Sequence, residues 1–164
     1  MEQLIPILLA PLPVLVVVAA LTDLTSMKIP NWISAALILA FFPAAFAVGL
    51  APIEVAFHFG VAVLVLVAGM AMYALRVIGG GDAKVMAAAS LWLGAGALTP
   101  FLIWTAILGG AFSLVLILGR TWASPHLAGA PAWVGALVRP KGDLPYGVAS
   151  RGGALMAYPA SALV

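Results

Sequence analysis

The sequence predicts an all-α protein that crosses a membrane about six times and forms one domain over residues 1–164. Hydrophobic residues make up 65% of the chain and charged residues only 7%, so most helices must be apolar on every face. Apolar runs of about 20 residues recur, and a helix of that length spans a bilayer. Polar, glycine-containing or proline-containing breaks separate these runs, as short connections between spanning helices do.

The first three predicted helices are each bounded by a polar or proline-containing break. No positively charged segment precedes residues 5–21, which favours a retained helix over a cleaved signal peptide. The second helix, residues 32–50, follows Pro30, which disfavours helix at the residue before it, and Asn31 is suited to cap it. The third helix covers residues 54–75 after a short turn.

The last three predicted helices are short or interrupted. Residues 83–98 follow a glycine-rich break and are short for a full span. A turn at Thr99-Pro100 leads into residues 101–118, since proline is favoured at the first position of a helix. The longest connection, residues 119–144, has an apolar middle too short to span, which predicts an interfacial segment. A basic residue and two glycines interrupt the sixth helix, residues 146–164.

Positive charges fall on one side of this topology. The connections after the first, third and fifth helices contain Lys or Arg, whereas the N-terminus and the other two connections contain neither. By the positive-inside rule, the basic connections are cytoplasmic and both termini lie outside. Asp23 follows the first helix and Asp82 begins the fourth, so both acids are expected at the same cytoplasmic boundary.

Composition excludes several kinds of site. With no cysteine, the chain has no disulfide, no thiolate metal site and no cysteine nucleophile. His58 and His126 lack metal-ligand spacing, so we expect no metal and no cofactor. His58 is expected to be a hydrogen-bonded structural residue. The net charge of +2 is too small to indicate binding of nucleic acid.

Two acids at one membrane boundary predict a specific chemistry. An ionisable group at membrane depth is costly unless it is paired, hydrated or functional. Two carboxylates within hydrogen-bonding distance share a proton, so that one can act as general base for a water and the other as general acid. Asp23 and Asp82 are candidates for such a pair. The alternatives are a solvated loop acid at Asp23 and a helix cap at Asp82.

The residues around Asp82 are also unusual. Gly79, Gly80 and Gly81 provide bare backbone, either for a tight turn or for close approach of another chain. Lys84 is either a phospholipid anchor or a modulator of Asp82.

Three motifs, in order along the chain, resemble those of the type IV prepilin peptidases, a family of membrane aspartyl proteases. Gly79-Gly80-Gly81-Asp82 fits the GxGD signature, and residues 80–88 are similar to this family's version of it. Asp23 followed by Ile29-Pro30-Asn31 resembles the first catalytic motif. Residues 144–149, with Pro145, Tyr146 and Gly147, resemble the entry to the final helix.

The resemblance implies an aspartic-type peptidase that removes the short basic leader from prepilin or pilin-like precursors, after a glycine. Asp23 and Asp82 would be catalytic, at the cytoplasmic face of a bacterial inner membrane, and the partners would be these precursors and membrane lipid. Substrate-binding or site-shaping roles would fall to Gly79, Gly80, Gly81, Lys84, Pro30, Asn31, Pro145, Tyr146 and Gly147.

The resemblance leaves several points open. The compact form looks most like peptidases of tight-adherence (Flp) pili, with archaeal preflagellin peptidases as the alternative. Without a paired-cysteine zinc motif or an N-terminal cytoplasmic domain, N-methyltransferase activity is not expected. Arg151 departs from the family pattern, and it either extends to the lipid headgroups or faces the site. A non-enzymatic transporter or scaffold is the other class, although a transporter favours ionisable groups near the bilayer midplane. The oligomeric state is not defined.

Overall fold

The computed structural model describes residues 4–26, 28–123 and 146–164, with the backbone alone at 120–123 and 146, and this part of the chain is helical. Four stretches are long and apolar enough to cross a membrane: Ile5–Ser26, Asn31–Val48, Pro52–Ala74 and Gly80–Gly119. The predicted class, an all-α multi-pass membrane protein, is confirmed. The elements are α1 (Ile5–Leu9), α2 (Pro11–Ser26), α3 (Asn31–Val48), α4 (Pro52–Ala74), α5 (Gly80–Ala123), α7 (Tyr146–Ala157) and the short 3₁₀ helix η1 (Tyr158–Ala160).

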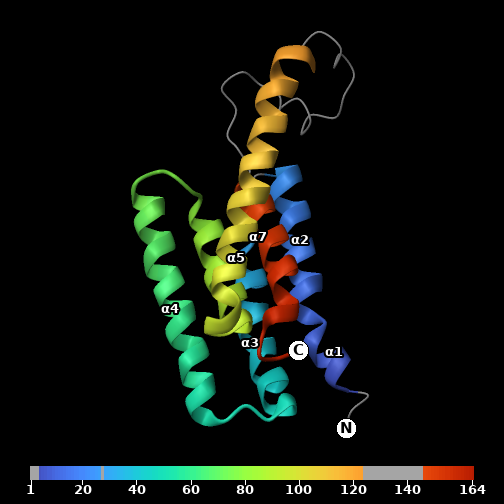
Figure 1. The fold of residues 1–164 in the computed structure, drawn as a ribbon, viewed down its shortest axis with the longest axis vertical. Coiled ribbons are helices and arrows are strands. Elements are labelled where there is room, and N and C mark those ends of the chain that lie inside the picture. The colour runs from blue at the N-terminus through green and yellow to red at the C-terminus, as the bar shows by residue number, and fades with distance from the viewer. Residues whose placement is uncertain (1–3, 27, 124–145) are drawn as a thin grey trace.

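Helix α5 consists of two halves that meet at Gly94. The backbone of Gly94 has φ 66° and ψ −173°, a left-handed φ that glycine adopts readily. Figure 1 shows that the chain reverses there, so the two halves run antiparallel. A Cβ at Gly94 would lie 2.7 Å from Cε1 of His58, so a side chain is excluded by space as well as by conformation.

The predicted turn at Thr99-Pro100 is therefore wrong. Pro100 lies within the second half of α5, close to its start. A proline inside a membrane helix is tolerated because neighbouring helices and local adjustments can satisfy the backbone groups that it frees. The break instead falls where only glycine accepts the backbone conformation and the neighbouring His58 ring.

Two other boundaries also differ from the prediction. Helix α2 continues to Ser26, whereas the sequence predicted an end at residue 21. The hydroxyl of Thr25 donates to the carbonyl of Leu21 at 2.8 Å and that of Ser26 to the carbonyl of Thr22 at 2.6 Å, so these polar side chains are accommodated within the helix. The sixth helix was predicted to reach residue 164, but α7 ends at Ala157 because Pro159 cannot supply the next helical hydrogen bond.

Buried polar groups bond to backbone carbonyls and hold the helices together. Trp92 Nε1 donates to the carbonyl of Leu37 in α3 at 2.9 Å, and the Ser161 hydroxyl donates to the carbonyl of Trp92 at 2.6 Å. His58 Nδ1 lies 2.6 Å from the Leu91 carbonyl oxygen, which confirms the structural role predicted for this histidine. The first half of α5 is thereby bonded to three parts of the bundle.

The connections that contain the candidate residues lie on one side of the helix bundle. Figure 1 shows the α2–α3 and α4–α5 connections on the side away from the N- and C-termini, with the second half of α5 extending beyond them. Asp23 lies in the last turn of α2, not beyond the helix as predicted, and Asp82 lies in the first turn of α5. The predicted interfacial segment within residues 119–144 and the site residue Pro145 lie outside the described residues, apart from the end of α5.

Candidate active site

Three charged side chains from three helices meet on this side of the bundle. Arg151 in α7 donates through Nη1 to Oδ2 of Asp23 at 3.3 Å and through Nη2 to Oδ1 of Asp82 at 3.1 Å. Arg151 is 1% exposed, Asp23 6% and Asp82 9%. The structure thus brings the two predicted acids together, and a residue whose role the sequence left open joins them.

Gly147 makes this meeting possible. It lies one helical turn before Arg151 on α7. A Cβ at this position would overlap Arg151 Nη1, Asp23 Oδ2 and Asp82 Oδ1 at once. The three charged groups therefore converge on the bare backbone of α7. Gly147, one of the predicted site residues, leaves space for them because it has no side chain.

Both acids line a cavity of about 380 Å³ between α2, the α2–α3 connection and the start of α5. The other lining residues are Lys28, Ile29, Asn31, Gly79, Gly80 and Gly81. The three glycines, which we call the triple glycine, therefore border the acids as predicted. None of the three has a positive φ, so their backbone conformation would accept a side chain.

Packing, however, limits what the triple glycine can accommodate. A Cβ at Gly79 would lie 3.2 Å from Asp82 Oδ2, and one at Gly81 would lie 3.2 Å from the Ile29 side chain. At Gly80 the nearest atom would be in the Tyr73 ring, 3.4 Å away. The first and third glycines are thus the more restricted positions.

Lys84 faces α3 instead of the acids. Its Nζ donates to Oδ1 of Asn31 at 3.1 Å. Pro30 precedes Asn31 in an extended conformation, with φ −62° and ψ 135°, and so sets the start of α3. Lys84 and Asn31 therefore join two helices beside the cavity.

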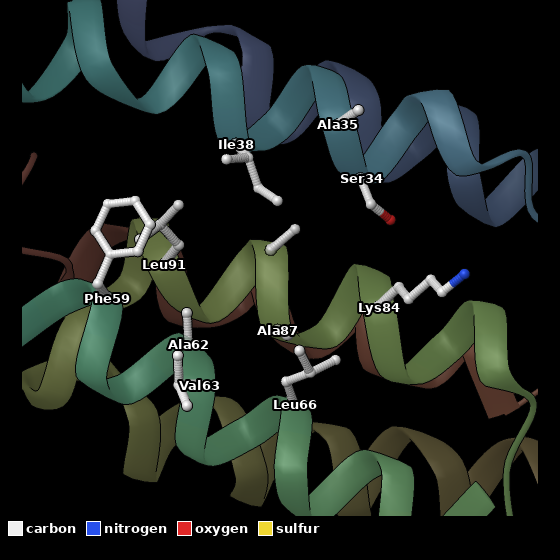
Figure 2. A pocket seen from close by; sticks show the side chains of 11 residues that line it. Ser34, Ala35, Ile38, Phe59, Ala62, Val63, Leu66, Lys84, Ala87 and Leu91 are labelled. Carbon is white, nitrogen blue, oxygen red and sulfur yellow. The ribbon is translucent and has the colours of Figure 1, made fainter.

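An apolar groove of about 340 Å³ begins at Lys84. Figure 2 shows Lys84 and Ser34 at one end of the groove and Phe59 and Leu91 at the other. Between them the walls are formed by side chains of α3, α4 and the first half of α5: Ala35, Ile38, Ala62, Val63, Leu66, Ala87 and Ala88. The groove is open to an apolar ligand and has its cationic end near the acids.

A second cavity, of about 300 Å³, adjoins Asp82 and is lined by both halves of α5, α4 and α7. Thr105 and Ser150 are among its lining residues. The Thr105 hydroxyl is buried and has no hydrogen-bond partner among the described residues. Sequence reasoning missed both residues, because a hydroxyl in an apolar helix gives no signal until the reversal at Gly94 determines its neighbours.

Within the described ranges, no group of three or more His, Cys, Asp or Glu side chains could hold a metal ion. The groups that the described residues supply at the site are two carboxylates, the guanidinium that bonds to them, the Lys28 and Asn31 side chains in the cavity wall, and backbone groups of the triple glycine. For Tyr146, another predicted site residue, the structure gives only the backbone, as the first residue of α7.

Comparison with protein families identifies one match. A family model described as the type IV leader peptidase family matches residues 10–114, a range that includes Asp23, the triple glycine and Asp82. Searches of curated proteins and of solved structures found no significant match. Helix α7, with Gly147 and Arg151, lies beyond the matched range. Because the match covers more than half of the chain, this membrane protein belongs to the type IV leader peptidase family, a family of proteases, as its motifs predicted.

Proposed function

We propose that the protein is an aspartic-type endopeptidase that removes the leader from prepilin or pilin-like precursors, with Asp23 and Asp82 as its catalytic pair. The observation that carries this proposal is the meeting of the two acids, from α2 and α5, at the wall of one cavity. Family membership supplies the class of reaction. The geometry supplies the groups that can perform it.

The proposed reaction needs one ionised and one protonated carboxyl group. With Arg151 positively charged, this protonation state gives the buried cluster no net charge, which is the least costly state away from water. The ionised carboxylate takes a proton from a water in the cavity, and the water oxygen bonds to the carbonyl carbon of the substrate. The other carboxyl group gives its proton to the carbonyl oxygen. The C–N bond then breaks, and the leaving amine takes a proton from the acid formed in the first step. A hydroxyl group of the intermediate returns a proton to the other carboxylate, which restores the starting protonation state.

We propose six crossings, with both termini outside and the acids at the cytoplasmic boundary of a bacterial inner membrane. Each half of α5 would count as one crossing, and α7 with η1 as the last. The positive-inside asymmetry supports this topology. The position of the α2–α3 and α4–α5 connections on one side also supports it, because both acids adjoin these connections (Figure 1).

In this proposal, the leader junction and the apolar part of the precursor bind to different parts of the protein. The leader junction would lie in the cavity, beside the triple glycine, whose bare backbone allows an extended strand to approach closely. The apolar part of the precursor would lie in the groove that begins at Lys84. We further propose that the enzyme serves pili of the tight-adherence type and lacks N-methyltransferase activity. Cleavage of archaeal preflagellins is the alternative.

The test is co-expression with a candidate prepilin, followed by cleavage of that precursor with purified enzyme in detergent. Asp23→Asn and Asp82→Asn should each abolish the leader-sized mobility shift and still be recovered from the membrane, because an amide can neither activate water nor donate the required proton. Glu54→Gln is the matched control. Glu54 is an acid at the start of α4, where it accepts a hydrogen bond from Ala51 N at 2.7 Å. Substantial cleavage by either asparagine variant would exclude Asp23 and Asp82 as the catalytic pair. A wild-type protein that does not cleave the precursor would favour the alternative of a membrane scaffold or transporter.

A further inference from the structure

Arg151 lies behind the two acids as seen from the cavity. It is 1% exposed and is not among the residues that line the 380 Å³ cavity, whereas Asp23 and Asp82 are. It reaches the acids from α7, the helix packed against both α2 and α5. The guanidinium therefore leaves the cavity side of the pair unobstructed.

The oxygen atoms of Asp82 show this division directly. Arg151 Nη2 donates to Oδ1. The other oxygen, Oδ2, faces Gly79, where a Cβ would lie 3.2 Å from it. Gly79 is part of the cavity wall. One oxygen is thus held by α7, and the other is presented toward the space in which a substrate and a water would react.

Within the described residues, Arg151 is the side chain that bonds to both acids. They come from different helices, and two carboxylates repel each other when both are ionised. The guanidinium is planar, and its two terminal nitrogens have a fixed spacing. It therefore fixes the positions of both carboxylates relative to one rigid group. Its Nε is buried without a hydrogen-bond partner among the described residues. Within these residues, the two carboxylates are therefore the groups that compensate for burying the positive charge of Arg151.

The other lysine and arginine side chains that the structure describes form no ion pair with the two acids. Lys28 lines the cavity itself, Lys84 donates to Asn31, and Arg76 is exposed at the end of α4. Among the described ion pairs, both contacts of the acids are to Arg151.

We propose that Arg151 is a positioning residue for the catalytic pair: from behind, it holds one oxygen of each aspartate and so fixes the separation and orientation of the oxygens that face the cavity. This inference rests on the proposed peptidase function. It assigns a role in catalysis to a residue outside the range that the family model matches. Arg151 touches neither water nor substrate in this role.

The test compares steady-state cleavage of a prepilin peptide by Arg151→Met, Arg151→Lys and wild type, each normalised to folded enzyme. Misplacement of a catalytic group by about 1 Å can cost about a hundredfold in rate, so we expect kcat of Arg151→Met to fall by about that factor. KM should be unchanged, because the cavity and the groove keep their lining. Arg151→Lys should be intermediate, since an ammonium retains the charge but lacks the planar fork. The control Arg76→Met, which removes an exposed arginine, should behave as wild type.

Wild-type kcat in Arg151→Met, or a higher value, would overturn the inference, and so would a loss that only follows the amount of folded protein. If Arg151→Met does not fold, Arg151→Lys decides: a lowered kcat at constant KM supports the role, and an unchanged kcat excludes it. Failure of the proposed peptidase function would give a different result: either the wild-type protein would not cleave the peptide, or the asparagine variants would cleave it.

Discussion

Gly147 and Arg151 lie one turn apart on α7, and the bare backbone of the first is the surface on which the guanidinium of the second meets both aspartates. A methyl group at Gly147 would occupy the volume in which these three charged groups converge. The final helix is therefore part of the site in two ways: it supplies one charge and leaves room for two others.

Gly147→Ala should consequently cost most of the cleavage activity. The new methyl must displace the guanidinium, the carboxylates or α7 itself, and a shift on the order of 1 Å lowers the rate by about a hundredfold. The measurement is kcat for a prepilin peptide together with thermal unfolding in detergent. Gly60→Ala is the control, because a Cβ at Gly60 in α4 meets nothing within 4 Å. Full activity in Gly147→Ala would mean that the site tolerates a different arrangement of the three charges.

Gly81→Ala should impair cleavage more than Gly80→Ala. A methyl group at Gly81 would press on Ile29 in the cavity wall at 3.2 Å, whereas one at Gly80 would make ordinary contact with the Tyr73 ring at 3.4 Å. Neither position has a positive φ, so backbone strain adds nothing to either variant. Turnover per folded enzyme is the quantity to compare. If both variants lose activity only in proportion to folded protein, the triple glycine is a turn and not a substrate contact.

Ala35→Phe should raise KM and leave kcat nearly unchanged. Ala35 lines the apolar groove beside Lys84, and a phenyl ring there would fill space that we assign to the apolar part of the precursor. Leu39→Phe, one turn further along α3 and outside the groove lining, is the matched control. An unchanged KM in Ala35→Phe would show that the precursor lies elsewhere.

Gly94→Ala should destabilise the protein without touching the acids. A residue with a Cβ is strained at φ 66°, and the methyl would lie within 3 Å of the His58 ring. Strain of this kind costs on the order of 1–3 kcal/mol, so thermal unfolding in detergent should shift downward by several degrees. Gly110→Ala, in the second half of α5 with no atom within 4 Å of its Cβ, should leave the unfolding temperature near that of wild type.

Reporters can test the proposed topology. A reporter fused after Val164 should read as outside, and one inserted at residues 119–144 as cytoplasmic, because Lys and Arg lie in the alternate connections. A cytoplasmic C-terminus would require an odd number of crossings, and the common depth of the two acids would then need another explanation.

Much of this arrangement was predictable, because apolar length and charge asymmetry are properties of local sequence. The helical class and the four predicted stretches before residue 100 followed from apolar length, with boundaries shifted by a few residues. The family followed from the three ordered motifs. Asp82 next to the triple glycine was recognisable because a charge beside bare backbone is unusual in an apolar chain.

What could not be predicted depends on contacts between distant helices. The reversal at Gly94 lies against the His58 ring, which comes from α4 and leaves no space for a side chain there. Arg151 was conspicuous as a charge in an apolar run, but its direction depends on how α7 packs on α2 and α5. Sequence spacing contains no information on that packing, so both the guanidinium bridge and the role of Gly147 required the structure.

The reversal at Gly94 has a consequence for the lipid around the enzyme. The first half of α5, residues 80–93, is about 20 Å long at a rise of 1.5 Å per residue, whereas the hydrocarbon core of a bilayer is about 30 Å thick. Where a bilayer thins locally to match a helix this short, headgroups and their hydration move inward. Asp82 stands at the start of this short helix. Hydrolysis consumes a water molecule in every turnover, and a thinned annulus would let that water reach the acids without an aqueous channel through the protein.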